Sequence, residues 1–406
     1  MTQALSLAEE LSLEETLVSG TNVTIHQLLT DEELALANQQ VVYKNDVHTF
    51  QHMGLLREVA LTSKNKIAKL KHGMAMAGRG DAFVLQLGLC AETMDGKTSA
   101  MVKEYAENLG MLVNGLADTL EQAIGKPIIR VVRGAGQFAK PRSVAKEKDG
   151  EWTFRGEVTN GMNDRTPNAA RLVKAYHFSH LVRENLPENV HASHEALSLA
   201  YEVGLDQGDY LGSAPFVWIG NRTNHPDKLH VQFLKNKQNI IGIKVDGDMQ
   251  PEMLDQLINE LNPDMEEGKI ALIYRIGVKN DVKAKARPLL SVARKYGAAV
   301  LNMCDPAHAN VETDEASGKK TRRMSNMIKE TLLFAEVCNE EEVPLAGVNV
   351  EMSAEDVTEC LEEGVTDLTI NYQTTVDPCM NAHQGNAYVQ KALIPSLQRV
   401  QKPVMA

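Results

Sequence analysis

Short apolar runs alternate with longer amphipathic stretches along most of the chain, starting near residue 82. Each apolar run ends in polar or charged side chains, which is typical of buried strands in a parallel sheet. Strands are expected at 82–89, 127–132, 190–194, 214–219, 240–244, 270–274, 298–303 and 347–350. Helices are expected between them at 100–124, 169–183, 227–237, 250–261, 282–296 (interrupted by Pro288) and 321–342.

The regular alternation indicates a parallel sheet with right-handed crossovers. Eight repeats favour a closed (β/α)8 TIM barrel over a doubly wound sheet. We expect the barrel to occupy 81–406 and a mostly helical extension to occupy 1–80. A long connection, roughly 140–168, follows the second strand and is expected to contain a lid, a hairpin or an interface.

Smaller features complete the expected fold. Helical spacing in the extension covers 5–17, 29–36 and 53–76, and a turn follows at 78–81. After the last strand, a helix is expected to start at Ser353, with Asp356 at the spacing of a capping box. A final helix is expected over 386–400.

The chain has 406 residues, of which 43% are hydrophobic, and a formal net charge of −12. This acidic balance argues against nucleic acid and anionic membrane surfaces as partners. The five cysteines are widely spread and odd in number, and the N-terminus lacks the features of a signal peptide. No apolar run reaches the roughly 18 residues of a membrane span, so we expect a cytoplasmic protein.

Metal-ligand types gather at the ends of the predicted strands, which all face one mouth in a barrel. One thiol, one imidazole and two carboxylates suit Mn²⁺, Co²⁺, Fe²⁺ or Zn²⁺. They belong to Cys90, His308, Glu351 and Asp377. Taken alone, Cys90 also fits a buried small hydrophobe and His308 a structural histidine. A lone carboxylate such as Glu351 on an apolar strand would be costly to bury.

A second group at the strand ends is basic. Its members are Arg133, Lys140, Arg142, Arg222, Lys244 and Arg275. Such residues taken singly are often solvated charges at a rim, but on an acidic protein this cluster would repel itself unless anions lay among them. Arginine forks match phosphate and carboxylate. The mouth is therefore expected to bind a molecule with at least two anionic groups.

Two other motifs have weaker readings. Gly134–Ala139 has the G-x-G-x-x-A spacing of a dinucleotide site, but Pro141 falls where the phosphate-binding helix would run. The pair His177 and His180, and the stretch His191–Glu195, have no accompanying ligands nearby in the sequence. Structural roles are expected for these histidines.

Taken together, the motifs resemble the class II family of 3-deoxy-D-arabino-heptulosonate-7-phosphate (DAHP) synthases. The matching stretches are Leu89–Glu92, Arg133–Ser143, Ser193–Glu195, Trp218–Thr223, Gly242–Lys244, Cys304–His308, Val357–Cys360 and Asp377–Pro378. Among them, Ala135–Ser143 is the most specific. The short length and the stretch Tyr210–Ser213 resemble the compact members of specialised pathways such as phenazine biosynthesis.

The resemblance implies a TIM barrel with Cys90, His308, Glu351 and Asp377 as ligands of a divalent metal, Mn²⁺ being the expected ion. It implies that phosphoenolpyruvate is held by Arg133, Lys140, Arg222, Lys244 and Arg275. It also implies that Arg142 and Ser143 bind the phosphate of erythrose 4-phosphate. Lys140, Lys244 and His308 are expected to serve the chemical step. The family norm is a homodimer or larger assembly, and its reaction is a step of the shikimate pathway.

The implied reaction is an aldol-type condensation. C3 of phosphoenolpyruvate attacks the aldehyde carbon, water adds at C2, and phosphate leaves. The chain departs from the family pattern beside the expected site, at Leu89, Asn221, Asn302, Asn349 and Cys379. These departures leave two alternatives open: the same chemistry on a different aldehyde in a specialised-metabolite pathway, and an inactive paralogue that acts as a binding partner.

Overall fold

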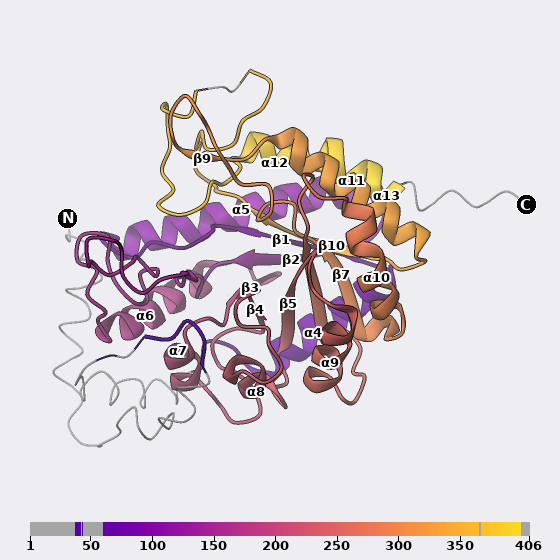
Figure 1. The fold of residues 1–406 in the computed structure, drawn as a ribbon, viewed down its shortest axis with the longest axis horizontal. Helices are drawn as coiled ribbons and strands as arrows, with labels where there is room; N and C mark the ends of the chain where they lie inside the picture. The colour runs from indigo at the N-terminus through magenta and orange to yellow at the C-terminus, as the bar shows by residue number, and fades with distance from the viewer. Residues whose placement is uncertain (1–36, 42, 44–59, 365–366, 399–406) are drawn as a thin grey trace, which may run out of the picture.

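Eight parallel strands close into a barrel in the computed structural model, which describes residues 37–41, 43, 60–364 and 367–398 (Figure 1). The strands are hydrogen-bonded in the order β1-β10-β7-β6-β5-β4-β3-β2. Their bounds are β1 Phe83–Gly88, β2 Ile128–Arg133, β3 Val190–Glu195, β4 Phe216–Ile219, β5 Ile240–Asp246, β6 Ile270–Arg275, β7 Val300–Cys304 and β10 Leu345–Glu351. The eight predicted strands and the barrel are confirmed.

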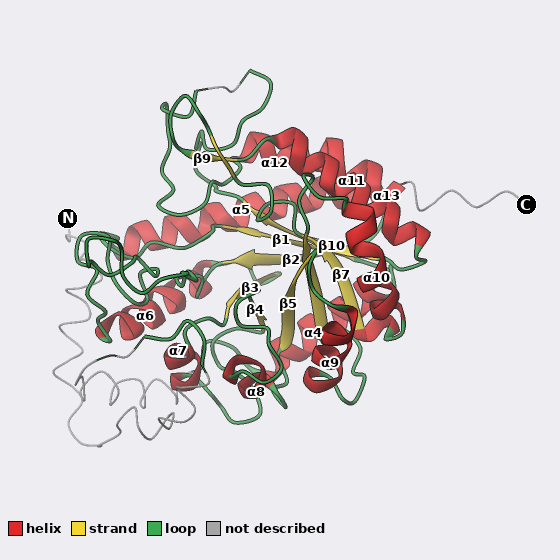
Figure 2. Cartoon of the chain, in the orientation of Figure 1, coloured by secondary structure: helices red, strands yellow, loops and turns green. Residues whose placement is uncertain are grey.

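Helices surround the strands, as Figure 2 shows in red against the yellow sheet. They are α5 Ser99–Ile124, α6 Ala170–Asn185, α7 Leu199–Gly204, α8 Leu229–Leu234, α9 Pro251–Leu261, α10 Val282–Arg294 and α11 Met324–Glu340. The predicted interruption of α10 is absent, since the helix runs through Pro288. The short helix α7 was not predicted, and α8 is shorter than its pattern indicated.

Helix α4 (Lys64–Gly78) closes the bottom of the barrel. Its apolar residues, Ile67, Leu70, Met74 and Ala77, pack into one core with the inward side chains of the strands. The predicted helix over 53–76 is confirmed from Lys64 onward, and so is the turn at 78–81, where Gly80 has a φ of +81°. The expected helices over 5–17 and 29–36 lie outside the described residues. With one end filled by α4, the carboxyl ends of the strands form the open mouth.

The predicted helix at Ser353 is wrong. The segment from Ser353 to Cys360 is irregular, because long-range bonds hold its backbone instead of helical ones. The amide of Thr358 donates to the carbonyl of Asn371, and the carboxylate of Glu359 accepts from the amides of Gln373, Thr374 and Cys379. The hydroxyl of Ser353 accepts from the amide of Glu355, two residues on, and not from the third residue of a helix.

Three smaller elements complete the fold. A hairpin of β8 (Glu312–Thr313) and β9 (Lys320–Thr321) stands over the mouth and was not predicted. The long connection after β2 contains one small hairpin-like bridge, between Lys146 and Trp152. The final predicted helix is observed as α12 Ala382–Tyr388, a π-helical segment η4 Val389–Leu393 and α13 Ile394–Gln398. Within the described part of the chain, none of the helices combines the length and apolar character needed to cross a bilayer.

Lys269, which lies just before β6 at the bottom of the barrel, carries a testable consequence for stability. Its ammonium donates to the carbonyls of Lys237 and Asn239, and burial, with the charge of Lys71 adding, lowers its pKa to about 7. The unfolded chain would bind this proton up to a pKa of about 10.4. Between these values the unfolded state holds more protons, so the free energy of unfolding should rise with pH, by up to about 1.4 kcal/mol per pH unit.

We expect Lys269→Met to flatten this rise between pH 7 and 9, measured as the urea concentration at the midpoint of unfolding. Lys103→Met, at an exposed lysine of α5, is the control and should keep the slope of the parent protein. Equal slopes in Lys269→Met and the parent would contradict the prediction.

Candidate active site

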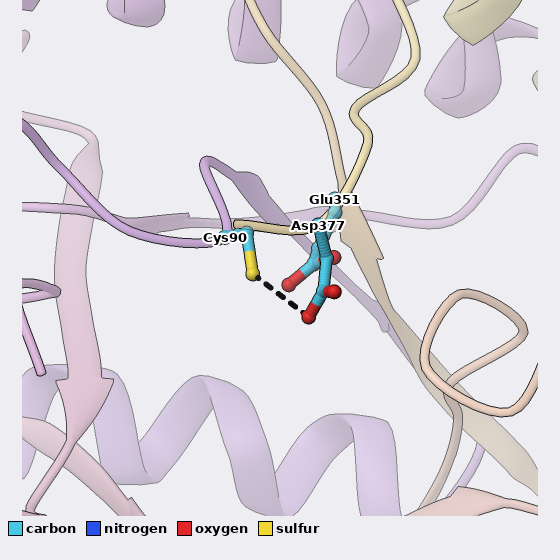
Figure 3. Close-up of side chains that lie close together, drawn as sticks. All are labelled: Cys90, Glu351 and Asp377. Atoms are coloured by element: carbon cyan, nitrogen blue, oxygen red, sulfur yellow. Dashed lines mark hydrogen bonds between the residues drawn. The ribbon is translucent and has the colours of Figure 1, made fainter. Parts of the chain in front are cut away.

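Three side chains of the mouth form a compact group of donor atoms. Cys90 follows β1, Glu351 ends β10, and Asp377 belongs to the loop that follows β10. Their ligand atoms all lie within 4.8 Å of one another, and Figure 3 shows the three side chains pointing toward a common space. Cys90 and Glu351 are buried, whereas Asp377 is half-buried. The structure thus brings together three of the four metal ligands predicted from the sequence.

His308, the fourth predicted ligand, stands at the edge of this group. Its Nε2 lies 2.9 Å from Glu351 Oε1, and its Nδ1 lies 2.8 Å from Asp305 Oδ2. The carboxylate of Asp305 on Nδ1 orients the ring so that Nε2 is directed at the donor group, as in many metal sites. His308 therefore fits the role of a ligand that Asp305 orients.

The ammonium of Lys140 lies against the donor group. It donates to Cys90 Sγ at 2.7 Å and to Asp377 Oδ2 at 3.2 Å, so a cation already contacts two of the three donors. Burial, with the charge of Glu351 adding, raises the pKa of the Cys90 thiol to about 12. One sulfur, two carboxylates and an adjacent imidazole fit a divalent transition metal, whose binding requires the thiolate.

Two arginines clamp the carboxylate of Glu351. Arg133 Nη2 lies 2.9 Å from Oε1 and Arg322 Nη2 lies 2.5 Å from Oε2. Arg133 also donates to Asn349 Oδ1 at 2.7 Å and lies over the ring of Trp218. Burial alone would raise the pKa of Glu351. The charges of His308, Arg322 and Arg133 outweigh burial and hold that pKa well below its ordinary value.

Arg322 was missed by the sequence reasoning. It is fully buried and also donates to the carbonyls of Ala307 and Pro378, which neighbour His308 and Asp377. In the sequence it belongs to the run Lys319–Arg323, which has the composition of an exposed, solvated segment. No local signal separates Arg322 from its neighbours, since only the tertiary fold buries it.

The remaining basic residues fall into two places. On the side of β7, Lys244 pairs with Asp305, and Arg275 Nη2 donates to the carbonyl of His308 at 3.1 Å. On the side of β4, Arg222 Nη2 donates to Ser143 Oγ at 3.0 Å. The guanidinium of Arg142 lies nearby in the chain and donates to the carbonyl of Phe154 at 2.6 Å. The six predicted cations therefore line one mouth but form separate subgroups.

Buried cations gather in the interior of this mouth. They are Arg133, Lys140, Lys244 and Arg322, and the carboxylates that pair with them are Glu351, Asp305 and Asp377. Two buried donors, Arg275 Nε and Asn349 Nδ2, have no hydrogen-bond partner among the described residues. Buried cations and buried donors without a partner are the features of a site for an anion.

The weaker motifs have structural roles. The amides of Ala135, Gly136 and Gln137 surround the carboxylate of Glu92 at 2.8 to 3.0 Å, so the backbone donors that a dinucleotide would need are occupied. His194 Nε2 lies 2.7 Å from Glu202 Oε1 in the interior. His180 pairs with Glu184 on the surface of α6. Neither histidine belongs to the donor group.

The five departures from the family pattern occupy different surroundings. Asn302 accepts from the hydroxyl of Tyr274, whose ring packs against Phe334 of α11, so it lies on the outer face of the barrel and not in the mouth. Of the five departures expected beside the site, Asn302 therefore points away from the mouth. Asn349 binds Arg133, and Asn221 Nδ2 donates to Asp246 Oδ2 at 2.5 Å.

Leu89 and Cys379 line a cavity of about 320 Å³ that also touches Cys90. Its other walls come from α5, α6 and the loops after β10, through residues such as Met101, Phe178 and Val357. Leu89, Ala91, Cys90, Phe154, Val376 and Cys379 form one small apolar cluster. A cavity of mixed polarity therefore adjoins the donor group, and the two substituted positions belong to an apolar part of its wall.

Known proteins resemble this chain over most of its length. The model of the class-II DAHP synthetase family matches residues 31–187 and 180–389. A phospho-2-dehydro-3-deoxyheptonate aldolase of Streptomyces coelicolor is 31% identical over 78% of this chain and 85% of its own length. One from Mycolicibacterium smegmatis is 30% identical over 80% of this chain and 85% of its own length. A protein of Pseudomonas fluorescens named "Probable phospho-2-dehydro-3-deoxyheptonate aldolase" is 30% identical over 86% of this chain and 92% of its own length.

The position of Arg322 generates a prediction about metal binding. Arg322→Met should weaken the affinity for Mn²⁺ by about 10- to 100-fold, the usual effect of losing a group that orients a ligand. The loss follows because the guanidinium fixes Glu351 and the backbone beside His308 and Asp377. Equilibrium dialysis against Mn²⁺ measures the effect.

Arg323→Met is the matched control, since Arg323 is adjacent in sequence but half-exposed and paired with Glu312. Thermal denaturation of both variants separates a loss of folding from a loss of ligand geometry. Unchanged or tighter Mn²⁺ binding by a folded Arg322→Met protein would refute the positioning role.

Proposed function

The chain belongs to the class-II DAHP synthetase family, and from this premise we propose that it condenses phosphoenolpyruvate with erythrose 4-phosphate. The products would be 3-deoxy-D-arabino-heptulosonate 7-phosphate and inorganic phosphate. The enzyme is a transferase of the 3-deoxy-7-phosphoheptulonate synthase type. The observation that carries the proposal for this chain is the compact donor group of Cys90, Glu351 and Asp377, set among the buried cations Arg133, Lys140, Lys244 and Arg322.

We propose that Cys90, His308, Glu351 and Asp377 hold a divalent metal. When bound, the metal supplies Lewis acidity toward the aldehyde oxygen. Orientation of His308 by Asp305 and of Glu351 by its two arginines supports this assignment. Mn²⁺ remains the expected ion, and Co²⁺, Fe²⁺ and Zn²⁺ suit the same donors.

The basic residues divide the two substrates between them. We assign the carboxylate and phosphate of phosphoenolpyruvate to Arg133, Lys140, Lys244 and Arg275. The resemblance implied the same role for Arg222, but we assign Arg222 to the second substrate instead, because its guanidinium donates to the hydroxyl of Ser143. Arg142 and Ser143 bind the phosphate of the aldehyde. Fixed cations of this kind orient both reactants, so that C3 of the enolpyruvate lies against the aldehyde carbon, and they stabilise charge on the departing phosphate.

Lys140, Lys244 and His308 are assigned to the chemical step. Burial disfavours the charged form of Lys140, but the neighbouring Cys90 and Asp377 outweigh it and raise its pKa above the ordinary value, so it remains an ammonium. We assign to its Nζ the donation of a proton to the oxygen of the former aldehyde. Lys244, whose pKa burial lowers, faces the phosphate that leaves after water adds at C2. His308 completes the ligand set and shares its Nδ1 proton with Asp305.

The proposed reaction is tested by the release of phosphate from phosphoenolpyruvate when erythrose 4-phosphate and Mn²⁺ are supplied. We expect Cys90→Ser and Asp377→Asn to lose about 100-fold or more of this activity, because each removes a charged donor from the metal group. Cys338→Ser, at a buried cysteine of α11 remote from the mouth, should keep it. Activity that survives removal of metal by a chelator would contradict the metal assignment.

A second candidate function uses the same chemistry on a different aldehyde, and the cavity beside Cys90 favours it. Leu89 and Cys379 stand where the family pattern has Asp and Arg, and here both belong to the apolar part of a cavity wall next to a proposed metal ligand. An aldehyde with an apolar substituent could pack against this part of the wall. The intact donor and cation groups argue against a role as a mere binding partner.

The double substitution Leu89→Asp with Cys379→Arg distinguishes these two substrates. If the native aldehyde is apolar, the double variant should gain at least about tenfold in kcat/KM for erythrose 4-phosphate relative to short aliphatic aldehydes, equivalent to about 1.4 kcal/mol. Parent protein that already prefers erythrose 4-phosphate over such aldehydes would exclude the second candidate.

The expected homodimer or larger assembly stays a prediction, which light scattering of the purified protein can test.

A further inference from the structure

A short N-terminal segment lies against two loops of the barrel mouth. We name Asn38, Gln39 and Gln40 the strap; in Figure 1 it is the indigo segment close to α7. Asn38 Nδ2 donates to the carbonyl of Arg222 at 3.0 Å, across 184 residues of sequence. Gln39 Oε1 accepts from the amide of Arg142 at 2.7 Å. The strap therefore bonds to the backbone of two residues proposed to bind substrate anions.

Further hydrogen bonds hold the strap itself in place. The carbonyl of Gln39 accepts from Arg155 Nη1 at 3.1 Å. Gln40 Oε1 accepts from the amide of Leu199, at the start of α7, and Gln40 Nε2 donates to the carbonyl of Leu197 at 2.8 Å. Gln39 has a φ of +66°, a conformation that non-glycine residues rarely adopt and that persists where tertiary contacts impose it.

The two loops have little regular structure of their own. Residues 140–145 after β2 and Gly220–Asn224 after β4 contain no helix or strand, and the second loop has a short turn in which the amide of Thr223 donates to the carbonyl of Gly220. Tertiary bonds therefore add to the definition of both backbones. Between the loops, Arg222 Nη2 donates to Ser143 Oγ at 3.0 Å. The strap adds a backbone bond on each side of this contact, and thus spans the gap between the two loops.

We propose that Asn38 and Gln39 are positioning residues that hold Arg142, Ser143 and Arg222 in register for one phosphate monoester, the phosphate of the aldehyde substrate. This inference rests on the proposed function. Three groups that must converge on one phosphate gain from being fixed before binding, because loops that order only on binding lose affinity. Neither strap residue contacts the donor group of Cys90, Glu351 and Asp377, so the effect is confined to the phosphorylated substrate.

The test uses the double variant Asn38→Ala with Gln39→Gly. Glycine removes the acceptor of Gln39 and adopts positive φ freely, so the turn itself is kept. With two hydrogen bonds lost, we expect KM for erythrose 4-phosphate to rise about tenfold. KM for phosphoenolpyruvate and the affinity for Mn²⁺ should stay within about twofold of the parent values. Gln232→Ala, at an exposed glutamine of α8, is the matched control.

Unphosphorylated erythrose separates positioning from a general structural role. A variant that only loosens the fold would lose kcat/KM equally with erythrose and with erythrose 4-phosphate, which would overturn the inference. The inference also fails if KM for erythrose 4-phosphate does not change. The expected result is a loss restricted to the phosphorylated aldehyde.

Direct binding distinguishes failure of the inference from failure of the proposed function. If the parent protein releases no phosphate with erythrose 4-phosphate, the proposed reaction is wrong. Calorimetric titration with erythrose 4-phosphate then still decides the role of the strap. About tenfold weaker binding by the double variant supports it, and equal binding, or no binding by the parent, overturns it.

Discussion

The buried carboxylate of Glu351 is the group on which the rest of the mouth depends. It has no exposed surface at the end of β10, and an uncompensated charge there would be strongly destabilising. Arg133, Arg322 and His308 share the compensation. They come from β2, from the segment between β9 and α11, and from the loop after β7. One carboxylate therefore connects parts of the mouth that are remote in sequence. Because α4 closes the opposite end of the barrel, these ion pairs lie at its open end.

Two of the cations that pair with the donor group, Arg133 and Lys140, are also assigned to substrate. In the structure, Lys140 contacts Cys90 and Asp377, and Arg133 contacts Glu351. A divalent ion in the donor group would take over part of this neutralisation. Positive charge on Lys140 and Arg133 would then be available to an anionic ligand in the same space. On the proposed function, the metal and phosphoenolpyruvate sites are coupled because they share their counter-charges.

The sequence predicts those features that depend on pattern and topology. Strand length and apolar character locate the eight strands, and the convergence of strand ends brings Cys90 and Glu351 together, with Asp377 supplied by the loop after β10. The sequence does not predict features that depend on tertiary bonds. Arg322 is buried by surroundings that its local sequence does not record, and the helical signal at Ser353 loses to long-range bonds of Thr358 and Glu359. Asn302 is close to the expected site in sequence, but its side chain points to the outer face of β7, where the hydroxyl of Tyr274 donates to it.

These constraints divide the mouth into a part that resists change and a part that tolerates it. Substituting a member of the Glu351 network would leave a buried charge unpaired, which is costly whatever the substrate. Leu89 and Cys379 lie beside that network in an apolar cluster, and their side chains compensate no buried charge. Their replacement changes the shape and polarity of a recess next to the donor group without disturbing the ion pairs. A change of aldehyde is therefore physically easier for this fold than a change of the group that activates it.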